Sequence, residues 1–319
     1  MRLRAAHVRV RVPATSANLG PGFDALGLAL GLHDELEVRA LGAPGVRVEV
    51  HGEGAGAVPE DETHLVVRAL RVALDHVGAP QTGLHLVCHN RVPHGRGLGS
   101  SAAAVVAGVL AARGLVAEPE ALDDDVALAL ATELEGHPDN AAPALLGGLT
   151  VAWTDDAPAT GTSPVHAVRL AVHEDLAPVA IVPPGHLSTH AARGVLPAQV
   201  PHADAAWQAG RSALLVEALG RRPDLLLPAT EDRLHQGYRR QVMPASLALV
   251  DALRARGVAA VVSGAGPTVL ALARRGPGAD GATDADAAIA DAFGGVMAGW
   301  RVTPLAVDEQ GASVTSLLD

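Results

Sequence analysis

The sequence predicts a two-domain protein that mixes α-helices and β-strands. The chain has 319 residues, of which 49% are hydrophobic and 18% charged, so a substantial core can form. Short segments of alternating apolar and polar residues are interspersed with longer segments whose apolar residues recur at helical spacing. A tract rich in Asp, Thr, Pro and Gly at residues 154–164 separates halves of similar size. We therefore expect one domain over residues 1–160 and another over residues 161–319.

The first half begins with a strand over residues 8–12, where Val alternates with Arg, and we expect Pro13 to end it. A loop of mainly small and polar residues follows at residues 18–24. Three aspartates at residues 123–125 indicate a helix start, because negative charge stabilises a helix N-terminus. Further strands are expected over residues 34–38, 46–50 and 83–89, and helices over residues 63–77, 100–112 and 123–135.

The second half continues the mixture of strands and helices. A low-complexity tract at residues 276–288 is expected to form an exposed loop that leads into a last helix after Gly281. The other elements expected here are strands over residues 166–173 and 178–182, helices over residues 203–219 and 245–255, and a strand pair around residues 264–266.

The charged residues exclude several functions. The chain contains 24 arginines and no lysine, whereas a Walker P-loop, a protein kinase and a Schiff-base enzyme all need a lysine. The net charge of −11 and an aromatic content of 2% argue against nucleic-acid binding. Because the overall field repels anions, an anionic ligand has to be held by local arginines and backbone amides.

The expected compartment is the cytoplasm. The one cysteine, Cys88, has no partner for an internal disulfide, which is typical of a reducing environment. No uninterrupted apolar stretch is long enough to span a bilayer, and the first residues lack an apolar signal core. We therefore expect no membrane partner.

A glycine-rich loop that leads into a helix of small residues is the first motif with chemical meaning. Residues 93–104 read Pro-His-Gly-Arg-Gly-Leu-Gly-Ser-Ser-Ala-Ala-Ala. Amides of such a loop and of the first helical turn point at one spot and bind phosphate, and the hydroxyls of Ser100 and Ser101 suit a phosphate oxygen or a metal. An ordinary tight turn is the alternative. A dinucleotide-binding loop is disfavoured because Ser100 occupies its third glycine position.

Two further motifs follow. Residues 133–140 read Glu-Leu-Glu-Gly-His-Pro-Asp-Asn, and either Glu133 or Glu135 would suit Mg²⁺, which prefers carboxylates together with phosphate oxygens. A solvated helix end is the alternative. Residues 261–268 read Val-Val-Ser-Gly-Ala-Gly-Pro-Thr, a glycine turn whose amides would close over a phosphate chain. A plain hairpin turn explains this last segment equally well.

In this order the three motifs resemble those of the GHMP small-molecule kinases. Residues 12–24, the Gly-His-Pro-Asp-Asn loop at residues 136–140, and Thr189 with Arg193 resemble the homoserine kinases in particular. The resemblance implies a two-domain α+β fold. The N-terminal domain would be similar to ribosomal protein S5 domain 2, the C-terminal domain would be ferredoxin-like, and the active site would lie between them.

The resemblance implies ATP and Mg²⁺ as cofactors. It implies that Ser101 and Glu133 hold Mg²⁺, and that the phosphates are wrapped by Gly97, Gly99, Ser100 and Ser101. The further ATP-binding positions implied are Pro93, Gly95, Arg96, Leu98, Ala102, Ala103, Gly264 and Gly266.

The implied acceptor is L-homoserine, phosphorylated on its side-chain hydroxyl as a step of threonine biosynthesis. Its ammonium needs a carboxylate, which Asp24 fits, and its carboxylate needs a guanidinium, which Arg193 and Arg239 fit. The hydrogen-bonding neighbours of the acceptor would be Asn18, His137, Asn140 and Thr189.

We expect direct transfer without a general base. Several GHMP kinases have a catalytic aspartate where this chain has Asn140, which cannot take a proton. Phosphoryl transfer depends mainly on positioning and charge stabilisation, so Asn140 would orient the hydroxyl while Ser101 and Glu133 help to neutralise charge. The hydroxyl proton would pass to the phosphate. Asp139 as a general base is the alternative.

Two positions depart from the family pattern. His64 stands where related homoserine kinases more often have asparagine, in the segment expected to meet the adenine, and Gly237 replaces a commoner proline, which would loosen Arg239. A kinase for another alcohol, such as mevalonate, has less use for Asp24 opposite two arginines. A catalytically silent sensor has no need of a complete Mg²⁺-phosphate site, and a nicotinamide enzyme would require a Rossmann half. A homodimer is expected from the resemblance alone.

Overall fold

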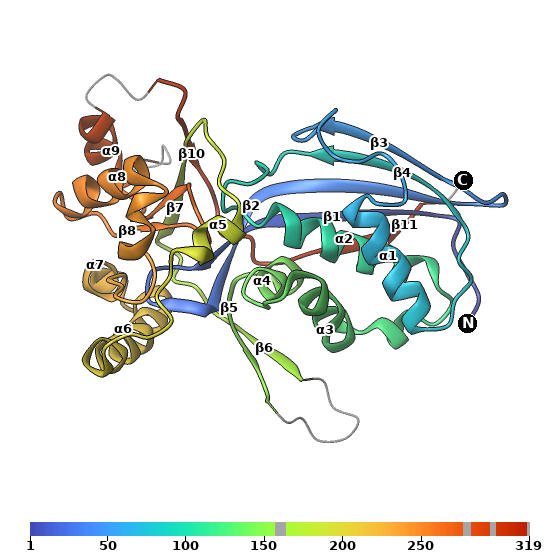
Figure 1. Cartoon of the computed structure of the whole chain (residues 1–319), viewed down its shortest axis with the longest axis horizontal. Coiled ribbons are helices and arrows are strands. Elements are labelled where there is room, and N and C mark those ends of the chain that lie inside the picture. The colour runs from blue at the N-terminus through green and yellow to red at the C-terminus, as the bar shows by residue number, and fades with distance from the viewer. Residues whose placement is uncertain (157–163, 277–281, 294–297, 318–319) are drawn as a thin grey trace.

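The computed structural model describes residues 1–156, 164–276, 282–293 and 298–317. Two sheets lie toward opposite ends of the molecule (Figure 1). The larger sheet comprises β1 (His7–Asn18), β2 (Gly22–Leu41), β3 (Val46–Gly52), β4 (Gly83–Asn90), β5 (Leu149–Thr154), β6 (Val165–Leu170) and β11 (Ser313–Ser316). Its order is β11-β1-β2-β4-β3, and β5 pairs with β2 and β6. The smaller sheet, in the order β10-β7-β9-β8, comprises β7 (Leu176–Val182), β8 (Ala260–Val262), β9 (Val269–Arg274) and β10 (Arg301–Pro304).

Helices pack beside both sheets. In the first half these are α1 (Leu65–His76), α2 (Ser100–Leu115), α3 (Asp124–Glu135) and α4 (Ala141–Leu146). In the second half they are α5 (Thr189–Gly194), α6 (His202–Gly220), α7 (Leu226–Ala229), α8 (Pro244–Arg254) and α9 (Asp286–Phe293). Short 3₁₀ turns are η1 (Pro119–Leu122), η2 (Pro223–Leu225) and η3 (Gly237–Gln241).

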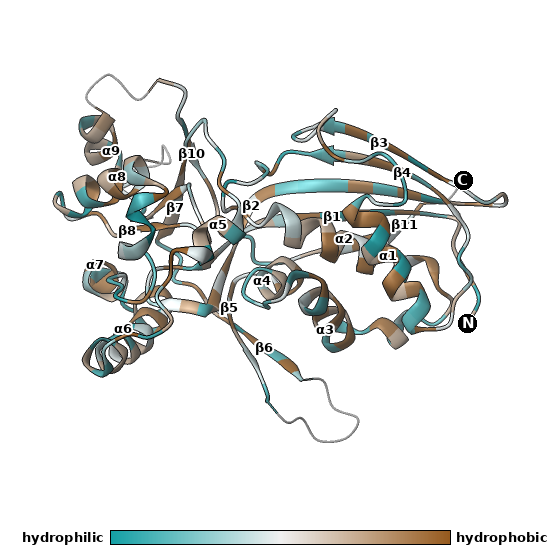
Figure 2. Cartoon of the chain, viewed as in Figure 1, coloured by the Kyte–Doolittle hydropathy of each residue, from teal (hydrophilic) through white to brown (hydrophobic). Residues whose placement is uncertain are grey.

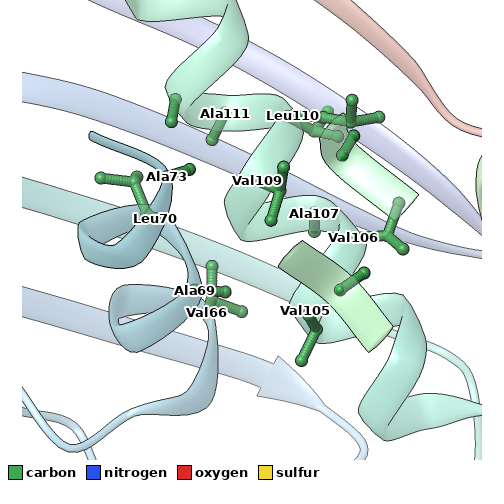
Figure 3. Packing of buried hydrophobic residues seen from close by; sticks show 14 of the residues in the cluster. Val66, Ala69, Leu70, Ala73, Val105, Val106, Ala107, Val109, Leu110 and Ala111 are labelled. Atoms are coloured by element: carbon green, nitrogen blue, oxygen red, sulfur yellow. The ribbon is translucent and has the colours of Figure 1, made fainter. Parts of the chain in front are cut away.

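The contact between α1 and α2 anchors the main core. Hydrophobic and hydrophilic residues lie side by side along α1, as an amphipathic helix requires (Figure 2). Its apolar side, with Ala69 and Leu70, packs against α2 (Figure 3). Gly108 permits this close approach, because a Cβ there would lie 2.5 Å from the Val66 carbonyl oxygen. The resulting burial of α2 fixes the direction in which its N-terminus points.

Most of the predicted elements are present, with ends shifted by a few residues, but two boundaries are wrong. The strand expected over residues 34–38 is part of β2, which begins at Gly22. β1 does not end at Pro13 but runs to Asn18. The register shifts between Pro13 and Ala14, so the proline, which has no N–H, sits at an irregularity of the ladder. The expected loop at residues 18–24 is a tight turn, and β2 begins at Gly22. The elements not predicted are α4, α5, α7, β5, β10 and β11.

Residues after 160 also build the larger sheet. β6 pairs with β5, and β11 pairs with β1. The division at residue 160 stays a prediction, because residues 157–163 lie outside the described ranges. The same holds for residues 277–281 of the loop expected at residues 276–288; the last helix, α9, begins at Asp286.

An ion pair ties the chain before β11 to β2. His33 Nε2 lies 2.6 Å from Asp308 Oδ2, and the two side chains are 10% and 9% exposed. Asp308 Oδ1 accepts hydrogen bonds from the amides of Gln310 (3.0 Å) and Gly311 (2.7 Å). Burial alone would raise the pKa of Asp308, but these hydrogen bonds together lower that pKa below its usual value.

We expect Asp308→Asn to lower the free energy of unfolding by about 1–3 kcal/mol at neutral pH, because the buried His33 loses its acceptor. The pKa of Asp308 is lower in the folded than in the unfolded chain, so the carboxylate's contribution is present above the unfolded-state pKa. It is lost as the pH falls through the folded-state pKa. Urea unfolding of both proteins at a series of pH values checks this: the two curves of stability against pH converge at acid pH. A difference that stays constant with pH would contradict the explanation.

Candidate active site

The N-terminus of α2 faces a cavity lined by residues of all three motifs. Gly97 and Gly99 have φ angles of 76° and 70°, which favour glycine. A Cβ on Gly97 would collide with the Ser263 carbonyl, and one on Gly99 with the Thr15 hydroxyl. These positions therefore exclude side chains, which leaves the loop and the helix N-terminus bare, as phosphate binding requires.

The third motif holds the glycine loop in place. The Ser263 hydroxyl donates to the Gly97 carbonyl at 2.6 Å and lies 2.8 Å from the Ser16 hydroxyl. The Gly264 amide donates to the Ala17 carbonyl at 3.0 Å. The turn after β8 is thus joined both to the glycine loop and to β1.

The carboxylate beside the glycine loop belongs to Glu135, whereas the assignment of Glu133 as the metal ligand stays a prediction. The Ser101 hydroxyl donates to the Glu135 carboxylate, and Glu135 lines the cavity. Glu133 lies two residues earlier on α3, is exposed to solvent and lines no part of it. Burial raises the pKa of Glu135, and the hydrogen bond from Ser101 opposes that rise.

Asn140 precedes α4 and lies beside the glycine loop, because a Cβ on Gly99 would be 3.1 Å from Asn140 Oδ1. The Thr15 hydroxyl donates to Asn140 Oδ1 at 2.8 Å, and Asn140 Nδ2 donates to Asp139 Oδ1 at 3.3 Å. Asp139 is only 2% exposed, and its Oδ1 lies 2.8 Å from His137 Nδ1. The hydrogen bond to Asp139 raises the pKa of His137. Asp139 is therefore already engaged by two neighbours.

Asp24 and Arg193 bind each other. The Arg193 guanidinium donates to both carboxylate oxygens of Asp24, at 2.7 and 3.1 Å. The Asp24 amide donates to Asn18 Oδ1 at 3.0 Å, and the Asn18 side chain donates to the Gly264 carbonyl at 3.0 Å. The predicted ammonium-binding and carboxylate-binding groups are thus neighbours. Asp24 reaches the cavity through Arg193, which lines it.

Arg239 is a buried cation that also lines this cavity, with 1% of its surface exposed. Its Nη1 donates to the Gly264 carbonyl at 2.9 Å, and its Nε donates to the Ala192 carbonyl at 3.3 Å. No carboxylate among the described residues lies within ion-pair distance of it. Burial, reinforced by the charge of Arg193, lowers the pKa of Arg239 to about 10. These contacts hold Arg239, and the loosening expected from Gly237 stays a prediction.

Two cavities adjoin and share Leu65, Ser100 and Ser101. The apolar cavity, of about 280 Å³, has walls that include Val58, Cys88 and Ala103. The polar cavity, of about 400 Å³, contains the motif residues described above. His64 lines the apolar cavity; its Nδ1 accepts from the Val66 amide at 3.3 Å.

Most of the predicted site residues line one of these two cavities, but five do not: Asp24, Pro93, Arg96, Leu98 and Glu133. Pro93 and Leu98 are buried elsewhere, and the Arg96 guanidinium donates to the carbonyls of Pro183 and Pro184 instead of facing a cavity. Ala103 lines the apolar cavity. The predicted residues that line the polar cavity are Asn18, Gly95, Gly97, Gly99, Ser100, Ser101, Ala102, His137, Asn140, Thr189, Arg193, Arg239, Gly264 and Gly266.

Thr15 and His235 are among the residues that contact this set and were not predicted from the sequence. Thr15 holds the Asn140 amide, and His235 holds Arg239. Thr15 lies inside the motif at residues 12–24, and this position is the one sequence signal that could have indicated its place in the site. Nothing in the local pattern around His235 indicates its contacts.

Comparison with known proteins defines the class of protein. The family model "GHMP kinases N terminal domain" matches residues 64–148, and "GHMP kinases C terminal" matches residues 213–292. The matches cover the glycine loop, the loop at residues 136–140 and the turn at residues 264–266, which line the polar cavity. The predicted α+β GHMP kinase fold is therefore confirmed.

Individual relatives narrow the class. The homoserine kinase of Streptomyces coelicolor is 55% identical over 316 residues, 98% of this chain and 96% of that protein. A crystal structure of homoserine kinase from Cytophaga hutchinsonii covers 97% of this chain and 98% of its own, with a TM-score of 0.79 and 28% identity. A putative homoserine kinase from Listeria monocytogenes covers 97% and 99%, with a TM-score of 0.73 and 32% identity. The chain belongs to the homoserine kinases.

Within the described ranges, no helix is both long enough and apolar enough to cross a bilayer.

Proposed function

We propose that this chain transfers the γ-phosphoryl group of ATP to the side-chain hydroxyl of L-homoserine, forming O-phospho-L-homoserine in threonine biosynthesis. One observation carries the proposal: the same polar cavity is lined by the glycine loop, by Asn140 and by Arg193 and Arg239, and Asp24 is paired with Arg193. A phosphate donor and a zwitterionic acceptor are the ligands that this charge pattern fits.

The two cavities fit the two ends of ATP. The apolar cavity would take the base, and the polar cavity the phosphates, because the N-terminus of α2 and the glycine amides lie where the two cavities meet. His64 accepts the Val66 amide through Nδ1, so its Nε2 carries the hydrogen and can donate to a ring nitrogen of the base. Burial lowers the pKa of His64, which keeps the ring neutral for this role.

The residues present fit Mg²⁺. The hydroxyl of Ser101 and the carboxylate of Glu135 are hard oxygen ligands that already lie in contact, next to the phosphate loop. When bound there with ATP, Mg²⁺ would neutralise charge on the phosphates. Glu135 takes the role in metal binding and catalysis that Glu133 was expected to have.

The acceptor site matches an amino acid. Asp24 would take the ammonium, and Arg193 and Arg239 the carboxylate, while Asn18, His137 and Thr189 supply hydrogen bonds. Among the described residues Arg239 has no carboxylate partner, so an anionic group of the ligand would satisfy it. Mevalonate offers a carboxylate for the arginines but no ammonium, so its binding would bring Asp24 no cation in addition to Arg193.

The transfer would be direct. Asn140 lines the cavity, and its Oδ1 can accept a hydrogen bond from the hydroxyl of L-homoserine. The Thr15 hydroxyl fixes the orientation of the Asn140 amide. The hydroxyl oxygen attacks the γ-phosphorus, the bond to the β-phosphate oxygen breaks, and the hydroxyl proton passes to the transferred phosphate. Ser101, Glu135 and the loop amides stabilise the developing charge. No general base is required in this scheme.

The wider setting follows from the resemblance of the sequence. We propose that the protein is cytoplasmic and forms a homodimer, and that its two domains divide near residue 160. Sedimentation analysis would test the homodimer, and limited proteolysis would test the domain boundary.

A coupled ADP-release assay with ATP and Mg²⁺ tests the proposal, with L-homoserine, L-threonine, L-serine and mevalonate compared as acceptors. We expect strong release with L-homoserine. Release with mevalonate alone would overturn the acceptor assignment. No release with any of the four, while ATP still binds, would overturn the activity and favour a silent sensor.

A further inference from the structure

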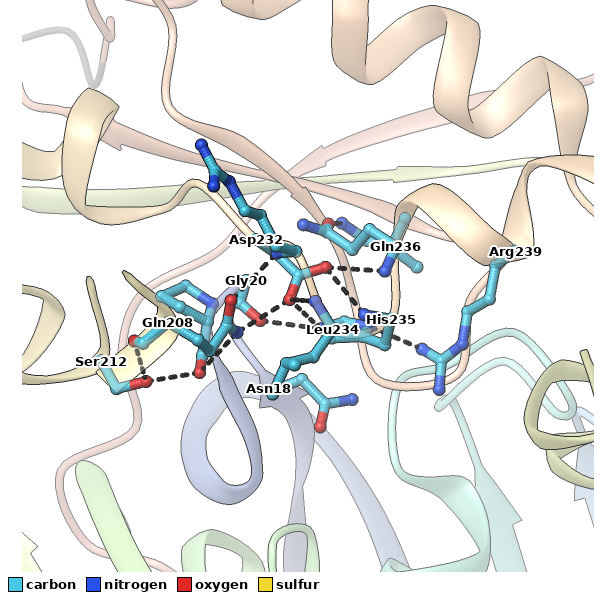
Figure 4. A network of polar contacts seen from close by, with 12 residues as sticks. Asn18, Gly20, Gln208, Ser212, Asp232, Leu234, His235, Gln236 and Arg239 are labelled. Atoms are coloured by element: carbon cyan, nitrogen blue, oxygen red, sulfur yellow. Dashed lines mark hydrogen bonds and ion pairs between the residues drawn. The ribbon is translucent and has the colours of Figure 1, made fainter. Parts of the chain in front are cut away.

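The side chain of His235 is fully buried between the turn at residues 18–24 and η3, outside both cavities. Its ring stacks on Phe23, with ring centroids 4.9 Å apart and planes 23° apart. Phe23 also lies against the guanidinium carbons of Arg193 and Arg239, which are 5.6 and 5.9 Å from the ring centroid. Of these two arginines, Arg239 is the one that lies beside His235 in Figure 4.

The two ring nitrogens of His235 have opposite roles. Nε2 lies 2.7 Å from the Gly20 carbonyl oxygen, which only accepts, so Nε2 carries the hydrogen. Nδ1 lies 3.1 Å from Arg239 Nη1, which only donates, so Nδ1 presents its lone pair. Both contacts exist together only in the neutral ring with this tautomer. Burial lowers the pKa of His235, which favours the neutral form.

The turn that carries His235 is itself fixed by Asp232. The Asp232 carboxylate accepts the amides of Leu234 (3.0 Å), His235 (3.1 Å) and Gln236 (2.7 Å), together with the side chain of Gln208 (2.8 Å). It lies 3.6 Å from His235 Nε2, beyond a hydrogen bond. The Asp232 carboxylate therefore holds the backbone of the turn, and the His235 ring makes its hydrogen bonds to Gly20 and Arg239.

His235 is one of three acceptors that engage the Nε and Nη1 nitrogens of Arg239. Nε donates to Ala192, and Nη1 is shared by Gly264 and His235 Nδ1. Nη2 has no acceptor among the described residues, and Arg239 lines the polar cavity. This arrangement leaves Nη2 for a ligand oxygen.

We propose that His235 is a positioning residue that aims Arg239 at the carboxylate of the acceptor while it holds the Gly20 turn that carries Asp24. One neutral ring thereby keeps the carboxylate-binding and ammonium-binding groups in a fixed relation. The inference rests on the proposed function, because it requires an amino acid as the acceptor.

Two substitutions separate the two contacts of the ring. His235→Gln places an amide nitrogen near Nε2 and keeps the donor to Gly20, but removes the acceptor that Nδ1 offers to Arg239. His235→Asn places an amide oxygen near Nδ1 and keeps that acceptor. L-homoserine is compared with 3-aminopropan-1-ol, which has the same hydroxyl and ammonium but no carboxylate; if its turnover is too slow, its inhibition constant against L-homoserine replaces kcat/KM.

We expect His235→Gln to lower kcat/KM for L-homoserine roughly 10- to 100-fold, the range for losing a hydrogen bond to a charged group. The kcat/KM for 3-aminopropan-1-ol and the KM for ATP stay within about twofold of their wild-type values, because neither ligand uses Arg239. His235→Asn retains the wild-type preference for L-homoserine over the amino alcohol.

An equal loss with both acceptors, or unchanged kinetics in His235→Gln, would overturn the inference, since a merely structural role does not distinguish them. If thermal melting shows that His235→Gln does not fold, His235→Asn decides alone: loss of its preference for L-homoserine would overturn the inference. Failure of the proposed function is distinguishable, because it appears in the wild-type protein as no turnover of L-homoserine.

Discussion

We expect Glu135→Gln to lower kcat about 10²- to 10³-fold, the range seen when one electrostatic contact to a developing charge is removed. The amide keeps the shape of the side chain and its contact with the Ser101 hydroxyl but loses the negative charge that suits Mg²⁺. The Mg²⁺ concentration needed for half-maximal rate rises as well. Steady-state ADP release over a range of Mg²⁺ concentrations measures both effects.

Glu133→Gln is the matched control. It makes the same chemical change two residues earlier on the same helix, at a solvent-exposed position outside the cavity. We expect its rate and Mg²⁺ dependence to stay within about twofold of the wild type, as for most surface substitutions. A large loss in Glu133→Gln with a normal Glu135→Gln would contradict the placement of the metal ligand.

Asn140→Ala is the second substitution with a large expected effect. Its amide is held by Thr15 and faces the polar cavity, so removing it leaves the acceptor hydroxyl without orientation. We expect kcat to fall about 10²-fold or more, with the KM for ATP nearly unchanged, because misplacement of a reacting group by about 1 Å can cost this much. Single-turnover measurements at saturating ATP separate this loss from a change in product release.

Asp139→Asn tests the alternative in which Asp139 is the general base. Asp139 is 2% exposed and is engaged by His137 and Asn140, so we expect its substitution to cost less than that of Asn140. A general base contributes about 10²- to 10⁴-fold. If only Asp139→Asn lost turnover, Asp139 would be the base and direct transfer would be refuted.

The motifs identified the site because their chemistry is local. A glycine loop that runs into a helix binds phosphate through its own amides, so residues 95–101 could be recognised without knowledge of the fold. Glu133 and Glu135 could not be told apart in this way. Both lie at the end of α3, and only the packing of that helix against α2 decides which carboxylate meets Ser101.

Other features depend on contacts between distant residues. Pro13 resembles a strand end, but pairing with β2 carries the strand past it through a shift of register. The role of His235 arises from the Gly20 carbonyl, 215 positions earlier in the chain. Such contacts leave no mark on local periodicity, so neither could be predicted from the sequence.

The pairing of β11 with β1 bears on how the protein folds during synthesis. Arg11 lies opposite Ser313, so about 300 residues must be made between the two partners, and the amide of Leu317 then donates to the His7 carbonyl. During synthesis, the last strand of the smaller sheet, β10, is made before β11, so the larger sheet still lacks β11 at that stage. Contacts this far apart in sequence form slowly, because a long loop must close first. Until then β1 has a free edge, and a nascent chain with such an edge is open to pairing with another copy or with a chaperone.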